Sequence, residues 1–164
     1  MWSPEALSRR AVLLGLLAVA GCGLSPVYGP GGGAGRLFGR IRPRDPDTPI
    51  DFAFNRRIAE RLGPDEAADY VLDYRISAGV VSQAITTDGV TTRYSLNGTA
   101  DFALRGPGGA LVTQGRVSSF TSYSTTGTTI ATLAAEGDAR ERLAVMLADQ
   151  VVTRLLAASA SLPG

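Results

Sequence analysis

The stretch Tyr70-Val71-Leu72-Asp73-Tyr74-Arg75-Ile76-Ser77-Ala78-Gly79-Val80 decides the fold of this chain. Every second side chain is apolar, and Asp73, Arg75 and Ser77 stand in the alternate row. A period of two is typical of a β-strand that buries one face and exposes the other. The stretch therefore predicts a long, half-buried strand.

The same alternation returns further along the chain. Thr87-Asp88-Gly89 supplies a turn, and residues 92–105 then alternate between an apolar or small row and a polar row. Gly106-Pro107-Gly108-Gly109 marks the next turn. The apolar or small row of this second strand consists of Thr92, Tyr94, Leu96, Gly98, Ala100, Phe102 and Leu104.

A third strand is predicted over about 111–124, where the phase of the alternation is less regular. Leu111, Val117 and Tyr123 fall on one face, whereas Val112 and Phe120 fall on the other. Either a β-bulge or partial cover of both faces accounts for this pattern.

Two amphipathic helices accompany these strands. The first is predicted to begin near Phe52 with Asp51 as its N-cap, and to end at Gly63-Pro64. The second begins at about Ala131 and carries an apolar residue at every fourth position. The apolar stripes are Phe54, Ile58 and Leu62 in the first helix, and Leu143, Leu147, Val151 and Leu155 in the second.

A short edge strand over Leu37–Arg42 completes the pattern, since Pro43 stops it and residues 44–49 form a turn. The resulting order is β-α-β-β-β-α. Strands with one apolar face need a cover, and the two helical stripes supply it. We therefore predict an α+β two-layer sandwich, in which a four-stranded, mostly antiparallel sheet carries both helices on one face.

The N-terminal region has the features of an export signal. Arg9-Arg10 precedes an apolar run of about ten residues, and Val19-Ala20-Gly21 precedes Cys22, the only cysteine. The apolar run is too short to span a bilayer, which takes about 20 residues. Val19-Ala20-Gly21-Cys22 is similar to a bacterial lipobox, so we predict lipidation of Cys22 rather than a free thiol. The segment is compatible with export by either the Sec or the twin-arginine route.

These features divide the chain into four segments. Residues 1–21 form a removable signal, 22–36 a lipid anchor and Gly/Pro-rich linker, 37–159 a single domain, and 160–164 a tail. Removal of 21 of the 164 residues leaves 143, enough for one hydrophobic core.

The composition argues against several classes of function. The chain has no histidine, every basic residue is an arginine, and the formal net charge is +1. This balance argues against nonspecific nucleic-acid binding. With neither histidine nor a second cysteine, we expect no metal site, no cofactor and no nucleophilic triad.

The lipobox, the start Cys22-Gly23-Leu24-Ser25-Pro26-Val27-Tyr28-Gly29 and the order of elements together resemble the LptE family of lipopolysaccharide-assembly lipoproteins. Two local strings add to the likeness. One is residues 83–93, and the other is residues 119–124 followed by 134–143 and 147–151. The resemblance covers essentially the whole mature chain. It implies a non-catalytic protein at the periplasmic face of the outer membrane. It also implies that the protein plugs the β-barrel protein LptD, assists its assembly and binds lipopolysaccharide.

Two arginines are candidates for contact with lipopolysaccharide phosphates, namely Arg93 beside the Asp88-Gly89 turn and Arg116 within the third strand. Each can equally be an exposed, solvated charge. The threonine-rich run Thr121–Thr132 is either a loop that touches the barrel or an ordinary strand end and helix cap.

Two other functions stay open on the sequence. One is an auxiliary lipoprotein of a phospholipid-trafficking ABC transport system. The other is a carboxylate enzyme acting on sugars, whose available acids are Asp88, Asp101, Glu136 and Asp138. None of these acids stands in a recognisable catalytic frame, so we expect no enzyme.

Overall fold

The computed structural model describes residues 29, 32–85, 91–125 and 127–159. Cys22, the Thr87-Asp88-Gly89 turn and the tail 160–164 lie outside the described residues. The elements follow in the order α2 (Ala34–Leu37), β1 (Ile41–Pro43), α3 (Pro49–Leu62), β2 (Tyr70–Ile85), β3 (Thr91–Arg105), a 3₁₀ turn (Pro107–Gly109), β4 (Leu111–Ser124) and α4 (Thr129–Ala158).

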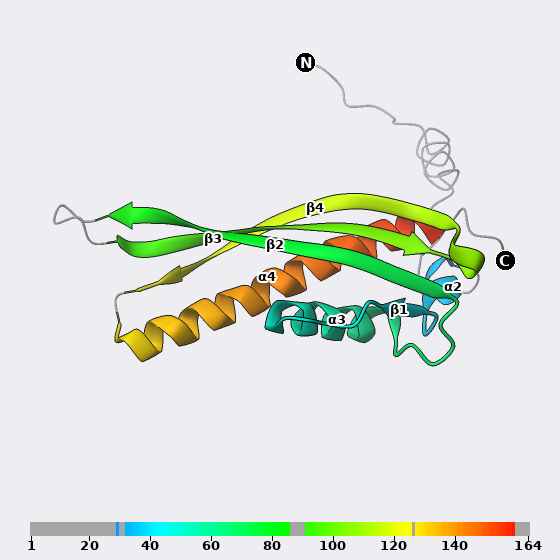
Figure 1. The fold of residues 1–164 in the computed structure, drawn as a ribbon, viewed down its shortest axis with the longest axis horizontal. Coiled ribbons are helices and arrows are strands. Elements are labelled where there is room, and N and C mark those ends of the chain that lie inside the picture. The colour runs from blue at the N-terminus through cyan, green and yellow to red at the C-terminus, as the bar shows by residue number, and fades with distance from the viewer. Residues whose placement is uncertain (1–28, 30–31, 86–90, 126, 160–164) are drawn as a thin grey trace, which may run out of the picture.

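The four strands form one sheet in the order β1-β2-β3-β4. β2, β3 and β4 are an antiparallel meander, and β1 pairs in parallel with the start of β2. Figure 1 shows α3 and α4 on one face of this sheet, and no described helix or strand covers the other face. The predicted α+β two-layer sandwich is confirmed. The sheet is mixed because α3 carries the chain from β1 back to a parallel neighbour.

The helix α4 is nearly as long as the strands that it covers (Figure 1). Its 30 residues span about 45 Å, and the 15 residues of β3 span about 50 Å. The side chain of Thr128 caps its first turn by accepting a hydrogen bond from the amide of Ala131 at 3.2 Å. The predicted stripe is confirmed, since Leu143, Leu147, Val151 and Leu155 are all fully buried.

Gly98 sets how closely α4 approaches the sheet. A Cβ at this position in β3 would lie 2.7 Å from Cδ2 of Leu143, which is itself fully buried. The absence of a side chain at Gly98 therefore lets Leu143 pack directly against the strand backbone.

Ion pairs hold the two helices beside each other. Arg57 donates to the carboxylate of Asp149 through Nε at 2.9 Å and Nη2 at 3.1 Å. Arg61 donates to the same carboxylate at 2.6 Å. Nearer the start of α3, Arg56 pairs with Glu141 of α4. These half-exposed pairs fix the orientation of the helices more than they add stability.

The first strand begins later than the sequence predicted. Leu37 ends the helical turn α2 and is fully buried, and β1 spans only Ile41–Pro43. Gly39 lies between them at φ +70°, a left-handed conformation that reverses the chain and that glycine adopts readily. The ordered fold therefore reaches back to Ala34, inside the segment expected to be linker.

The start of α3 is also corrected. Its N-cap is Thr48 rather than Asp51, and the helix begins at Pro49. Asp51 occupies the third position of a capping box, where its Oδ2 accepts from the Thr48 amide at 3.1 Å. The residue that was predicted to precede the helix lies inside it.

The irregular phase of the third strand comes from a bulge at its start. Leu104 pairs with Thr113 and Arg105 with Leu111, so Val112 is the extra residue. Leu111 therefore leaves the core face and is 51% exposed, whereas Val112 packs against the core. The sequence pattern had predicted the reverse, with Leu111 on the face of Val117 and Tyr123 and Val112 on the face of Phe120.

Candidate functional site

The uncovered face of the sheet is the first candidate surface, and we call it the open face. Side chains from neighbouring strands stand side by side on it in rows fixed by the strand register. The row Arg75–Asp101–Arg116 is charged, and the next row, Ser77–Thr99–Ser118, carries only hydroxyl groups. The open face includes Val71, Asp73, Arg75, Ser77, Val81, Asn97, Thr99, Asp101, Arg105, Leu111, Gln114, Arg116, Ser118 and Phe120.

Arg116, one of the two predicted lipopolysaccharide contacts, is paired with the carboxylate of Asp101. Its guanidinium donates to both oxygens of Asp101, at 2.5 and 3.0 Å. This hydrogen bonding lowers the pKa of Asp101 and raises the pKa of Arg116. Arg116 is exposed, but to bind a phosphate it must share its donors with Asp101.

Arg93, the other predicted contact, lies near the tip of the β2–β3 hairpin, far from Arg116 along the sheet. It is exposed and forms no ion pair with any acid among the described residues. The structure therefore does not bring the two predicted arginines together.

Sequence reasoning missed Arg75 as a candidate cation. It stands opposite Asp101 on β2, yet the carboxylate of Asp101 is held by Arg116 on the other side. Arg75 is exposed and makes no ion pair with a described acid. The alternation of 70–80 did place Arg75 on the polar face, but only the side-chain hydrogen bonds of the folded sheet show which arginine binds Asp101.

Together with Val71, Val81 and Leu111, Phe120 makes part of the open face apolar. It is 71% exposed and pairs across the strands with Asn97. Hydroxyl groups, an amide and an exposed ring within three neighbouring rows can hydrogen-bond and pack against the same partner. This composition suits a protein surface or a glycolipid better than a small apolar molecule.

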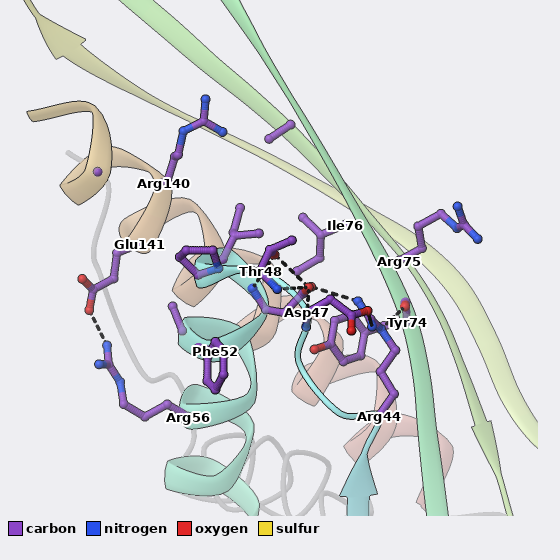
Figure 2. A pocket seen from close by; sticks show the side chains of 16 residues that line it. Arg44, Asp47, Thr48, Phe52, Arg56, Tyr74, Arg75, Ile76, Arg140 and Glu141 are labelled. Atoms are coloured by element: carbon purple, nitrogen blue, oxygen red, sulfur yellow. Dashed lines mark hydrogen bonds and ion pairs between the residues drawn. The ribbon is translucent and has the colours of Figure 1, made fainter. Parts of the chain in front are cut away.

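A groove of 1320 Å³ lies on the helical side of the sheet, between the start of α3, strand β2 and α4. We call it the α3–β2 groove. Figure 2 shows Phe52 of α3 and the N-cap residue Thr48 on one wall, and Tyr74 and Ile76 of β2 on the other. Phe52 is 62% exposed there. The apolar lining includes Ile50, Phe52, Ala53, Ile76 and Ala78.

Three of the four arginines that line the α3–β2 groove are paired with acids, and Arg75 at the β2 edge is paired with no described acid. Arg44 binds Asp47 at 2.6 Å and Asp51 at 3.1 Å, and Arg140 binds Glu136 at 2.7 Å. Arg56 and Glu141 meet across the mouth of the groove (Figure 2). The groove therefore has apolar walls and a rim whose charges largely cancel.

Tyr74 forms the inner end of the groove. Its ring packs on Phe54 with 4.4 Å between centroids, and the guanidinium of Arg44 lies 4.5 Å above the ring centre. Burial of the hydroxyl raises the pKa of Tyr74 to about 12, so this side chain keeps its proton even in moderately alkaline solution.

The remaining candidates have ordinary structural surroundings or fall outside the description. Thr121–Ser124 belong to β4 and Thr128 caps α4, so the run Thr121–Thr132 is not one loop. Of the acids considered for an enzyme, Asp101, Glu136 and Asp138 each pair with an arginine, and Asp88 is not described. Among the described residues, no three acids or other ligand-type side chains gather as a metal site would require.

The amino-acid sequence matches the LptE family, described as lipopolysaccharide-assembly, over residues 40–155. The chain belongs to the LptE family. The matched region runs from the strand β1 to the last turn of α4, so it contains the whole sheet, the open face and the α3–β2 groove. No curated protein matches the chain.

Solved structures share this LptE-type fold. A protein described as a candidate lipoprotein from Caulobacter crescentus aligns with a TM-score of 0.66 at 19% identity, covering 79% of this chain and 98% of its own. The rare lipoprotein B from Shewanella oneidensis aligns with a TM-score of 0.57 at 15% identity, covering 74% and 95%. A minor lipoprotein from Acinetobacter baumannii gives 0.52 at 15%, covering 72% and 89%. At these identities the likeness establishes the fold.

In the described part of this LptE-family chain, neither α3 nor α4 combines the length and the apolar character that crossing a bilayer requires.

Proposed function

We propose that this protein is an outer-membrane lipoprotein that acts as the partner of an LptD-type β-barrel in lipopolysaccharide assembly. Acylated Cys22 anchors it in the inner leaflet, and the domain occupies the periplasmic mouth of the barrel. The observation that carries the proposal is the LptE family match over residues 40–155. The role is one of binding rather than catalysis.

The surface of the domain supports this role. A protein that fits inside a barrel must satisfy a polar lumen, and the open face presents hydroxyl, amide and paired charged groups. The formal net charge of +1 avoids a strong field of either sign. The residues between Cys22 and α2 give the domain reach from its lipid anchor.

Arg93 and Arg116 remain the proposed contacts for lipopolysaccharide phosphates. Arg93 is the stronger candidate, because its guanidinium makes no ion pair with a described acid. Arg116 would need to keep or exchange its pairing with Asp101. A glycolipid that lies along the open face would meet Phe120 and the hydroxyl row between the two arginines.

Depletion of the protein in its own cells tests this proposal. We expect newly made lipopolysaccharide to stop reaching the cell surface while phospholipid transport continues. A role in a phospholipid-trafficking ABC system predicts the reverse, with phospholipid mislocalised and lipopolysaccharide export intact. A Cys22→Ser variant should fail to restore surface lipopolysaccharide, because the domain would no longer be held at the membrane.

A further inference from the structure

The strand β2 is only briefly covered on the side away from β3. β1 pairs with it through Tyr70–Leu72 alone, although β2 continues to Ile85. At the end of β1, the amide of Arg44 donates to the carbonyl of Leu72 at 3.0 Å. Nε of Arg44 then donates to the next edge carbonyl, that of Tyr74, at 2.8 Å. In the described part of the chain, no strand follows β1 along this edge.

The groups beyond Tyr74 are those of an unpaired strand edge. Successive residues of a strand direct their backbone groups to opposite sides, and Leu72 and Tyr74 use the side that faces β1. Ile76, Ala78 and Val80 therefore direct their N–H and C=O groups to the same open side. The sequence from Ile76 to Gln83 has neither the proline nor the charge that usually protects an exposed edge, and the register of β2 becomes irregular only after Ser82.

The opposite edge of the sheet is treated differently. On β4, the carbonyl of Ser118 accepts from Gln150 of α4 at 3.0 Å, and the carbonyl of Ser122 accepts from Arg142 at 3.4 Å. Side chains of α4 thus satisfy carbonyl groups along β4. The exposed edge groups of β2 are therefore specific to this strand and are not shared by the other edge strand, β4.

The α3–β2 groove lies directly beside the open edge. Ile76 and Ala78 of β2 line it together with Ile50 and Phe52 of α3. An added strand would pair with β2 where β1 ends, beyond Arg44. The side chains of the added strand on the helix side of the sheet would enter the groove. Main-chain pairing with pockets for alternate side chains is the chemistry of β-strand addition.

Charge indicates what the added strand should carry. Arg75 stands on the open-face side of β2, at the edge, and makes no ion pair with a described acid. The nearest cross-strand acid, Asp101, is already bound to Arg116. An acidic side chain on the added strand beside Arg75 would complete the row Arg75–Asp101–Arg116 as alternating charges.

We propose that the edge Ile76–Ser82 of β2 binds an extended segment of a partner polypeptide by strand addition. The segment presents apolar side chains to the α3–β2 groove and an acidic side chain to Arg75. This inference concerns the mode of binding and does not depend on which protein supplies the strand.

Amide hydrogen exchange of the lipid-free domain, with and without a blocked eight-residue peptide of alternating valine and threonine containing one glutamate, tests the proposal. In the free domain, the amides of Ile76, Ala78 and Val80 should exchange quickly, whereas those of Ser77 and Gly79 are protected by β3. At saturating peptide, exchange at the first three should slow by about tenfold or more. Unchanged exchange at these three amides overturns the proposal.

Variants sharpen this test. Ala78→Pro removes an edge N–H that pairs with no strand, and it should abolish binding. Ser77→Ala is the matched control, since it leaves the edge groups in place and should bind as the natural chain does. Arg75→Gln should weaken binding of the glutamate peptide severalfold and leave binding of the matching glutamine peptide unchanged. The comparison of the glutamate and glutamine peptides with Arg75→Gln tests the proposal even if Ala78→Pro does not fold.

Other occupants give different results, and each would overturn the proposal. Edge protection that rises with protein concentration, together with a dimer in ultracentrifugation, indicates a second copy of the chain. Shifts of the Ile50 and Phe52 resonances with phospholipid micelles, without edge protection by peptide, indicate a lipid in the groove.

A barrel complex that forms with the amides of Ile76, Ala78 and Val80 still unprotected overturns strand addition but leaves the proposed function standing. Protection of these amides by the peptide, without any barrel complex, supports strand addition and contradicts the proposed function.

Discussion

Arg116 and Asp101 face each other across β4 and β3, and their pairing has a measurable consequence. Because the guanidinium of Arg116 donates to both oxygens, the pKa of Asp101 lies below its ordinary value. A lowered carboxyl pKa stabilises the fold at neutral pH, and this contribution is lost as the pH falls through the folded value. Arg116→Gln should raise the pKa of Asp101, as followed by carbon NMR titration. Arg105→Gln, which removes the pair with Asp73, is the control and should leave Asp101 nearly unchanged.

Arg93 carries the prediction for lipopolysaccharide. Arg93→Gln should weaken the binding of purified lipopolysaccharide by several-fold, since one charge-assisted contact contributes about 1 kcal/mol or more. Arg116→Gln should weaken it less, because that guanidinium is already paired with Asp101. Binding to immobilised protein measures both variants side by side. Equal affinities of Arg93→Gln and the natural chain would remove Arg93 from the proposed contacts.

Tyr74 predicts how the fold responds to alkali. Burial raises its pKa to about 12, above the value of about 10 for tyrosine in an unfolded chain. The folded state therefore holds this proton more tightly, and the resulting stability is complete below about pH 10 and lost as the pH rises toward about 12. Tyr74→Phe should reduce the fall in the urea midpoint over this range. An identical fall in both proteins would show that Tyr74 does not titrate with unfolding.

At the scale of elements, the contact between β3 and α4 depends on Gly98. Gly98→Ala places a Cβ 2.7 Å from the side chain of buried Leu143, so it should lower the free energy of unfolding by about 1–3 kcal/mol. Gly79→Ala in β2 is the matched control, because a Cβ there meets nothing within 4 Å. Its effect should stay within about 0.5 kcal/mol. Urea unfolding measures both, and equal effects would mean that Gly98 does not set the helix approach.

Elements with a strong period were predictable from the sequence. The alternation of 70–80 and the stripe from Leu143 to Leu155 each describe one face of one element, so no tertiary contact is needed to interpret them. The start of α3 was missed, although Thr48 and Asp51 have the spacing of a capping box, because either residue can serve as the cap. The bulge at Val112 is defined only by its pairing with β3.

The candidate surfaces depend on pairing between elements, and this limited what the sequence could give. Arg75 and Arg116 are equivalent as isolated strand residues. In the folded sheet both lie beside Asp101, but only Arg116 binds its carboxylate. The α3–β2 groove arises because β1 stops at Pro43 while β2 continues. Neither length follows from the local alternation alone.

At the scale of the molecule, the two faces and two edges of the sheet have separate roles. One face buries the core beneath α3 and α4, and the other presents polar rows with Phe120. Side chains of α4 bind two carbonyls of the β4 edge, whereas no described strand pairs with the β2 edge beyond Tyr74. A domain of this kind has two surfaces on which a larger partner can assemble, and a lipid at Cys22 would hold it beside that partner.

Purification of the full-length protein from detergent-solubilised outer membranes tests the proposed partnership most directly. We predict that one large β-barrel protein of the LptD type co-purifies in a fixed ratio with the lipoprotein, and that mass spectrometry finds an acylated Cys22 at the mature N-terminus. Recovery of the lipoprotein without a barrel, or with an inner-membrane transporter complex in its place, would contradict the proposed function.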